Sequence, residues 1–143
     1  MKVRDIMNSR PVTVTPEESV EVAARLLGRH NIGMLPVCSD DGRLRGVVTD
    51  RDVVLRCVAG GDDAQITPVK EIMTRAVAVV SPEEDVSKAA EMMGRSQIRR
   101  LAVIDGGRLV GVVSLGDLAR RPDLRMEAAR ALGDISSNVR RMG

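Results

Sequence analysis

The 143-residue chain contains no phenylalanine, tyrosine or tryptophan. Its core must therefore be aliphatic, because the 43% of apolar residues are all Ala, Val, Ile, Leu, Met or Cys. Without aromatic rings the chain also lacks the platforms on which single-stranded bases stack, and a formal net charge of +2 is only weakly basic. We therefore expect no nucleic-acid partner.

Long apolar runs are missing as well. No segment approaches the ~20 apolar residues that a membrane-spanning helix requires. The N-terminal sequence MKVRDIMNSR also lacks the continuous apolar stretch of a secretion signal. We therefore expect a cytoplasmic protein that does not bind membranes.

Residues for catalysis and metal binding are scarce. The chain has one histidine, His30, and its two cysteines, Cys38 and Cys57, show neither CxxC nor metal-ligand spacing. It contains no nucleophile elbow and no Walker-type phosphate loop. We therefore expect neither an enzyme nor a metal protein. The cysteines are predicted to be free thiols in or near the core, with a regulatory disulfide between them as the alternative.

The chain does contain an internal duplication. A shift of 66 positions places Ile6 and Met7 on Ile72 and Met73, and a shift of 65 places GVVTDRD (46–52) on GVVSLGD (111–117). One residue is therefore missing from the second copy, in the turn before its third predicted strand. A half of roughly 60 residues would be marginal alone, so the two copies are expected to share a core.

Each copy predicts a β-α-β-β-α unit. Valine-rich runs at 12–14 and 77–80 predict short strands, each followed by a Ser/Thr-Pro-Glu-Glu helix-start signal. Apolar residues spaced i, i+3, i+4 and i+7 then predict helices ending near Arg29 and Arg95. Further runs predict a hairpin in each copy, at 34–38 with 44–49 and at 100–104 with 109–114, and a second helix at about 51–59 and 117–121. The fold class is α/β (α+β), with repeat 1 at 1–62, repeat 2 at 63–121 and a helical C-terminal tail at 122–143.

Each copy ends its third strand on a hydroxyl that is followed three residues later by a carboxylate: Thr49 with Asp52, and Ser114 with Asp117. Hydroxyl, helix-start amides and carboxylate would meet at one spot, which suits a ribose phosphate. A carboxylate can accept two hydroxyl protons, in charge-assisted hydrogen bonds of ~1.5–3 kcal/mol each. The alternative is structural: the hydroxyls cap the second helices and the carboxylates complement the helix dipoles.

The residues quoted above resemble a tandem pair of cystathionine-β-synthase (CBS) domains, the Bateman module. The resemblance covers residues 1–121 and rests on the duplicated unit, the DIM and EIM segments, the NIGMLPV and QIRRLAV segments and both G-h-h-[S/T]-x-x-D endings. It implies two pseudo-symmetric repeats packed through their sheets. It also implies two clefts between the repeats that bind adenosine-containing ligands such as AMP, ATP, NAD or S-adenosylmethionine, without catalysing a reaction.

The resemblance further implies roles for particular residues. Both motif aspartates would take ribose hydroxyls, and the motif Thr and Ser would lie near the ribose or phosphate. Arg99 and Arg100 would contact phosphates, or alternatively form a solvated charge pair on a strand edge. Their counterparts Gly33 and Met34 carry no charge, so the two sites should differ. The adenine slot would be formed by residues that could instead simply belong to the core: Val47, Val112, Thr15, Ser81, Met34, Pro36 and Ala102.

The function that follows is a regulatory sensor that binds an adenine nucleotide and signals through dimer geometry. Paired modules of this family commonly associate through their helices, and the Ala- and Met-containing segments 23–27 and 89–93 would allow close approach, which predicts a homodimer. The alternative is a protein–protein interaction module with vestigial clefts. The apolar stripe of the tail at 124–132 favours such a role and could pack on its own module or on a second chain.

Overall fold

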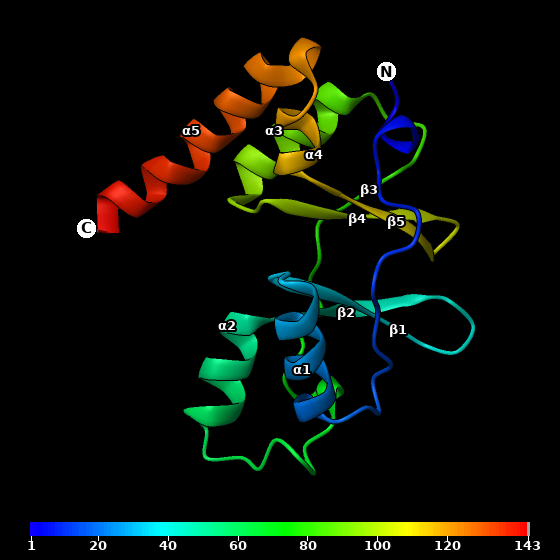
Figure 1. Cartoon of the computed structure of the whole chain (residues 1–143), viewed down its shortest axis with the longest axis vertical. Helices are drawn as coiled ribbons and strands as arrows, with labels where there is room; N and C mark the ends of the chain where they lie inside the picture. Colours follow the sequence, from blue (N-terminus) through cyan, green and yellow to red (C-terminus); the bar gives the residue numbers. More distant parts are fainter. Residues whose placement is uncertain (143) are drawn as a thin grey trace. The chain divides into compact units, whose positions relative to one another are not determined.

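The computed structural model describes residues 1–142, and side chains as far as residue 137. It divides the chain into two compact units, each of which is built around one repeat (Figure 1). The first-repeat unit consists of Pro11–Val77 and Gly107–Leu109. The second-repeat unit consists of Met1–Arg10, Ala78–Gly106 and the chain from Val110 onward. The N-terminal ten residues therefore belong to the unit of the second repeat.

The first-repeat unit has the predicted helix and hairpin. Its elements are α1 (Val20–His30), β1 (Met34–Cys38), β2 (Leu44–Thr49), α2 (Asp50–Asp52), the π-helical η2 (Val53–Val58) and the 3-10 helix η3 (Val69–Glu71). Strands β1 and β2 are antiparallel. The strand predicted at 12–14 is reduced to a single parallel bridge between Val14 and Val37. Helix α1 begins later than the Pro-Glu-Glu signal predicts, because Ser19 is the residue whose side chain accepts the amide N–H of Val22.

The second-repeat unit shares the order helix, hairpin and second helix, and it adds a first strand and a C-terminal helix. Its elements are η1 (Val3–Asp5), β3 (Val79–Val80), α3 (Val86–Ser96), β4 (Arg100–Asp105), β5 (Arg108–Ser114), α4 (Leu115–Ala119), η4 (Pro122–Leu124) and α5 (Arg125–Met142). The strand order is β3-β4-β5, with β3 parallel to β4. Asp85 caps α3 by accepting the amide N–H of Ser87. The α/β fold with two repeats and a C-terminal helix is therefore confirmed.

A short segment that precedes each repeat's first predicted strand pairs with the last strand of a hairpin. We call it the lead-in segment: residues 73–74 in the first-repeat unit and residues 1–10 in the second-repeat unit. Thr74 and Val47 exchange backbone hydrogen bonds of 2.8 and 2.9 Å in the first-repeat unit, and Asn8 and Val112 exchange bonds of 2.9 and 3.0 Å in the second-repeat unit. A Cβ on Gly46 would lie 2.5 Å from the Thr74 carbonyl oxygen, and one on Gly111 would lie 2.8 Å from that of Asn8. The glycine that opens each motif is therefore required for close approach of the lead-in segment.

Each unit has its own aliphatic core, contrary to the expectation that the two copies share one. The predicted apolar stripes of α1 and α3 face inward, since Ala23, Ala89 and Met93 have no exposed surface. Helix α5 packs on α3 and α4, and its buried side chains join the core of the second-repeat unit; they are Ala128, Ala131 and Ile135. The tail therefore packs on its own module. None of the described helices is long and apolar enough to cross a membrane.

Candidate functional site

The hydroxyl and carboxylate of each motif form a capping box at the end of the last strand. The Asp52 amide donates to Thr49 Oγ1 over 3.1 Å, and the Thr49 amide donates to Asp52 Oδ2 over 3.0 Å. The same pair of bonds joins Ser114 and Asp117, at 3.1 and 2.8 Å. The structural alternative considered for these residues is therefore realised in both repeats. Because the box uses only Oδ2, it leaves the other carboxylate oxygen available for further partners.

The second carboxylate oxygen has different partners in the two repeats. Asp52 is only 7% exposed, and its Oδ1 accepts the Thr74 hydroxyl over 3.2 Å and lies 3.6 Å from Arg56 Nε. Asp117 Oδ1 is paired with the guanidinium of Arg120, a side chain that is 72% exposed. An exposed arginine side chain therefore contacts Asp117, whereas the side-chain hydroxyl of Thr74 contacts the buried Asp52.

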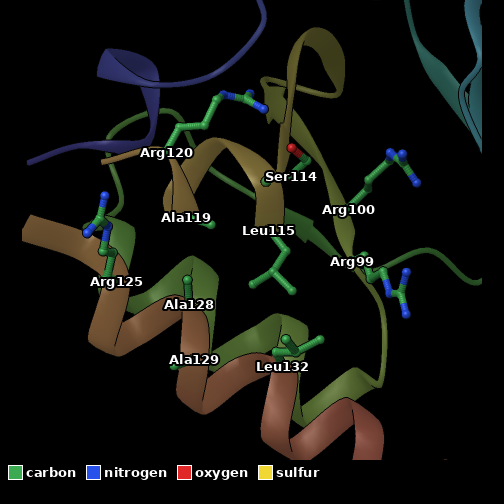
Figure 2. Close-up of a pocket in the computed structure, with 11 residues that line it drawn as sticks. Arg99, Arg100, Ser114, Leu115, Ala119, Arg120, Arg125, Ala128, Ala129 and Leu132 are labelled. Atoms are coloured by element: carbon green, nitrogen blue, oxygen red, sulfur yellow. The ribbon is translucent and has the colours of Figure 1, made fainter. Parts of the chain in front are cut away.

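A pocket of about 570 Å³ lies beside the capping box of the second-repeat unit (Figure 2). The start of β4, the end of β5, α4 and the first turns of α5 contribute to its walls. Its charged and polar lining residues are Arg99, Arg100, Ser114, Arg120 and Arg125. The remaining lining residues are Leu115, Gly116, Ala119, Ala128, Ala129 and Leu132. The structure thus brings three of the predicted site residues, Arg99, Arg100 and Ser114, to one hollow.

In the first-repeat unit the hairpin register brings four of the predicted residues together in two pairs. Met34 lies opposite Thr49, and Pro36 lies opposite Val47. Pro36 and Val47 are buried and Met34 is half-buried. Thr15 lies before α1, where its amide N–H donates to Glu18 Oε1 over 3.0 Å.

The other predicted adenine-slot residues lie in the second-repeat unit. Ala102 is 1% exposed and lies opposite Val79 in the β3–β4 pair. Val112 is half-buried, and Ser81 is exposed and accepts the amide N–H of Glu83 through its hydroxyl. None of these three lines the described pocket beside Ser114.

The sequence prediction did not include several residues at these sites. Thr74 follows the EIM segment at the position that Asn8 occupies after DIM, so the repeat offered a signal for both. Arg120, Arg125 and Leu132 carry no such signal, because exposed arginines and leucines on helices are common. Arg120 pairs with Asp117 three residues away, whereas the roles of Arg125 and Leu132 depend on α5 packing on α4.

Two further features of the described residues bear on chemistry. Among the described side chains there is no group of three or more His, Cys, Asp or Glu residues that could hold a metal ion. Cys57 is buried and Cys38 is half-buried, and both are free thiols. Burial raises the pKa of both thiols above the usual value for cysteine.

Comparison with known proteins places the repeats in one family. The CBS domain family matches residues 3–58 and 69–123 of the chain. CBS domain-containing protein YhcV of Bacillus subtilis is 41% identical over 134 residues, which cover 94% of this chain and 94% of YhcV. Hypoxic response protein 1 of Mycobacterium tuberculosis is 38% identical over 117 residues, which cover 82% of each. These relatives align over most of their own length, which leaves little room for a separate catalytic domain.

An enzyme also matches, but only in part. Homoserine O-acetyltransferase of Methanosarcina acetivorans is 35% identical over 113 residues, which make up 20% of that protein. The similarity therefore concerns the repeats and leaves most of that enzyme unmatched.

Solved structures show the same fold. Hypoxic Response Protein I with two coordinated zinc ions has a TM-score of 0.78 at 36% identity, covering 85% of this chain and 98% of that one. The CBS domain pair of protein MJ0100, in complex with 5′-methylthioadenosine and S-adenosyl-L-methionine, has a TM-score of 0.74 at 32% identity, covering 84% and 98%. Both molecules bound to MJ0100 are adenosine derivatives.

Proposed function

Because the chain belongs to the CBS domain family, we propose that it is a regulatory module that binds adenosine-containing ligands at its two hydroxyl–carboxylate motifs. The observation that carries this proposal is the repeated capping box. It presents a Thr or Ser hydroxyl beside an aspartate in the same geometry at the end of β2 and of β5. The complex of the related MJ0100 pair with two adenosine derivatives supports the same ligand class.

Each motif aspartate would bind the ribose of the ligand. A carboxylate accepts from two hydroxyls at once, and the box already fixes its orientation. At Asp117 the ribose hydroxyls would replace Arg120 on Oδ1, and the released guanidinium would be free to contact a phosphate. Replacing an exposed ion pair is inexpensive, since such pairs contribute little to stability.

The remaining predicted residues would complete the two sites. Thr49 and Ser114 would lie near the ribose or phosphate, and Arg99 and Arg100 would contact phosphate. Aliphatic contacts would hold the adenine ring, since the chain has no aromatic side chain. The residues proposed for these contacts are Val47, Met34, Pro36, Thr15, Val112, Ala102 and Ser81.

The two sites would favour different ligands. The second-repeat site has Arg99 and Arg100, whereas Gly33 and Met34 stand at the equivalent positions of the first repeat. Phosphorylated ligands such as AMP, ATP or NAD would therefore prefer the second-repeat site. Adenosine compounds without a phosphate, such as S-adenosylmethionine, would be better suited to the first.

Such binding would regulate without catalysis. A ligand shifts a conformational equilibrium only by as much as it prefers one conformation over the other. The only histidine, His30, is exposed at the end of α1 and belongs to neither motif. We therefore propose a sensor and not an enzyme.

Exposed apolar side chains support a second proposal, association into a homodimer. Val54, Leu55 and Val58 are 56%, 49% and 65% exposed on η2. The Ala- and Met-containing stripes of α1 and α3 are used inside each unit, so a second chain would contact η2 instead. This face would also serve the alternative function, a protein–protein interaction module.

Calorimetric titration tests the proposed ligand class. We expect AMP, ATP, NAD or S-adenosylmethionine to bind at millimolar concentration or below, and GMP to bind more weakly than AMP. Because the chain lacks tryptophan and tyrosine, a band near 260 nm in purified material would also reveal bound nucleotide. The proposal fails if no adenosine compound binds at millimolar concentration, or if GMP and AMP bind equally well.

A further inference from the structure

The pocket beside Ser114 is surrounded by positive charge. Four of its lining residues are arginines, and none is acidic. Arg120 is paired with Asp117, but among the described side chains Arg99, Arg100 and Arg125 form no ion pair. Uncompensated guanidinium groups around one hollow attract an anion, and they repel one another until an anion is bound.

The floor of the same pocket is apolar and is partly formed by the tail. Figure 2 shows Leu115 in the hollow, with Arg125 on one side and Arg99 and Arg100 on the other. Leu132 and two alanines of α5 complete the wall. The tail helix, which lies beyond the residues matched by the CBS family, is therefore a structural part of this pocket.

The first repeat has no equivalent of this arrangement. The positions that correspond to the four arginines are occupied by Gly33, Met34, Leu55 and Gly60. The segment after η2 also contains no helix like α5. The positive pocket therefore belongs to the second repeat and its tail, and it was not simply inherited through the duplication.

We propose that this pocket binds the linked phosphates of a di- or triphosphate, and that α5 belongs to the binding site through Arg125 and its apolar wall. This inference rests on the proposed function, because the pocket adjoins the Ser114–Asp117 box. A terminal phosphate group carries about −1.5 to −2 charges at pH 7, and each further phosphate of the chain adds negative charge. One phosphate can pair with Arg99 and Arg100 or with Arg125, whereas a chain of phosphates can neutralise both sides of the hollow. The guanidinium plane suits such pairing because it donates to two phosphate oxygens at once.

Titration of the full-length chain with adenosine, AMP, ATP and inorganic tripolyphosphate tests this inference. Wild-type protein should bind ATP more tightly than AMP, and added salt should weaken ATP binding more than AMP binding. Arg125→Gln should weaken the binding of ATP and of tripolyphosphate about tenfold, because it removes one charge-assisted hydrogen bond. Adenosine binding should not change. Arg125 is exposed, so the fold should be retained, as far-UV circular dichroism can verify.

A charge reversal on the α5 wall provides a second variant with a matched control. Ala129→Glu should weaken ATP and tripolyphosphate more than Arg125→Gln does, because it places a carboxylate beside the phosphates. Ala129→Gln has nearly the same size without the charge and should weaken them much less. Arg130→Gln removes a positive charge from the next position of α5, outside this pocket, and should leave all affinities near those of the wild type.

The outcomes separate this inference from the proposed function. Equal affinities for AMP and ATP, or ATP binding that survives both Arg125→Gln and Ala129→Glu unchanged, would overturn the inference and leave adenosine recognition intact. Tripolyphosphate binding that is weakened by Arg125→Gln, in a protein that binds neither adenosine nor AMP, would support the inference and overturn the proposed function.

Discussion

At the scale of single residues, the motif hydroxyls and carboxylates serve structure and are also proposed to serve binding. Each box satisfies two backbone N–H groups at the start of a short helix, and each uses only one oxygen of its aspartate. The sequence left a structural and a ligand-binding interpretation open. The capping role does not exclude ligand binding, because Oδ1 of each aspartate takes no part in the capping box.

Cys57 offers a test at the residue scale. Its side chain has no exposed surface, and burial, followed by the charges of Asp62 and Asp63, raises the pKa of its thiol. Since the thiolate is the reactive form, a raised pKa leaves less of it at neutral pH. We expect iodoacetamide to modify half-buried Cys38 well before Cys57 in native protein, as peptide mass analysis would show. Equal labelling rates in the folded chain would contradict the burial of Cys57.

At the scale of elements, the lead-in segments explain the glycine that opens each motif. Gly46 and Gly111 precede the two valines of each motif, and a side chain at either position would collide with a neighbouring backbone. The lead-in segments at 1–10 and 73–74 supply that backbone. The opening glycine is thus required by packing, and no ligand contact is needed to explain it.

Equivalent glycines of α1 and α3 test the packing of α5. A Cβ on Gly94 would lie 2.8 Å from Asp134 Oδ2 and 3.5 Å from the Ala131 Cα of α5, whereas a Cβ on Gly28 would meet nothing within 4 Å. Gly28→Ala should raise the free energy of unfolding by up to about 1 kcal/mol, because alanine is the better helix former. Gly94→Ala should raise the free energy of unfolding by less, or lower it, because the Asp134 side chain must move to make room for the new Cβ. Denaturant unfolding measures both variants, and an equal gain in the two would argue against close packing of α5 on α3.

At the scale of the whole molecule, local patterns predicted most of the elements. The 3.6-residue periodicity placed the ends of α1 and α3 within one residue, and the paired apolar runs placed both hairpins. The first strands were overestimated, because the run at 12–14 makes only one bridge to its neighbour. The predicted helical tail is observed as α5, which continues to Met142 although the apolar pattern weakens after Leu132.

Long-range contacts could not be predicted in the same way. The docking of residues 1–10 with the second repeat depends on pairing between Asn8 and Val112, which are far apart in the sequence. The pocket depends on α5 folding over α4, so Arg125 reaches the site through tertiary packing alone. Ser114, Arg99 and Arg100, which the repeat comparison singles out, line the pocket, whereas Arg125 and Leu132 of α5 line it with no signal in the sequence.

The central claim is that the two motif aspartates hold an adenosine ligand, and equilibrium dialysis with absorbance read near 260 nm tests it most directly. Asp52→Asn and Asp117→Asn retain an oxygen for the capping box but remove the negative charge, and Asp105→Asn, an exposed position at the end of β4, is the matched control. We expect each motif substitution to weaken binding of its preferred ligand about tenfold, with the larger effect on AMP and ATP from Asp117→Asn. The double variant should show both losses, and Asp105→Asn should match the wild type. Unchanged nucleotide binding in a folded double variant would contradict the account.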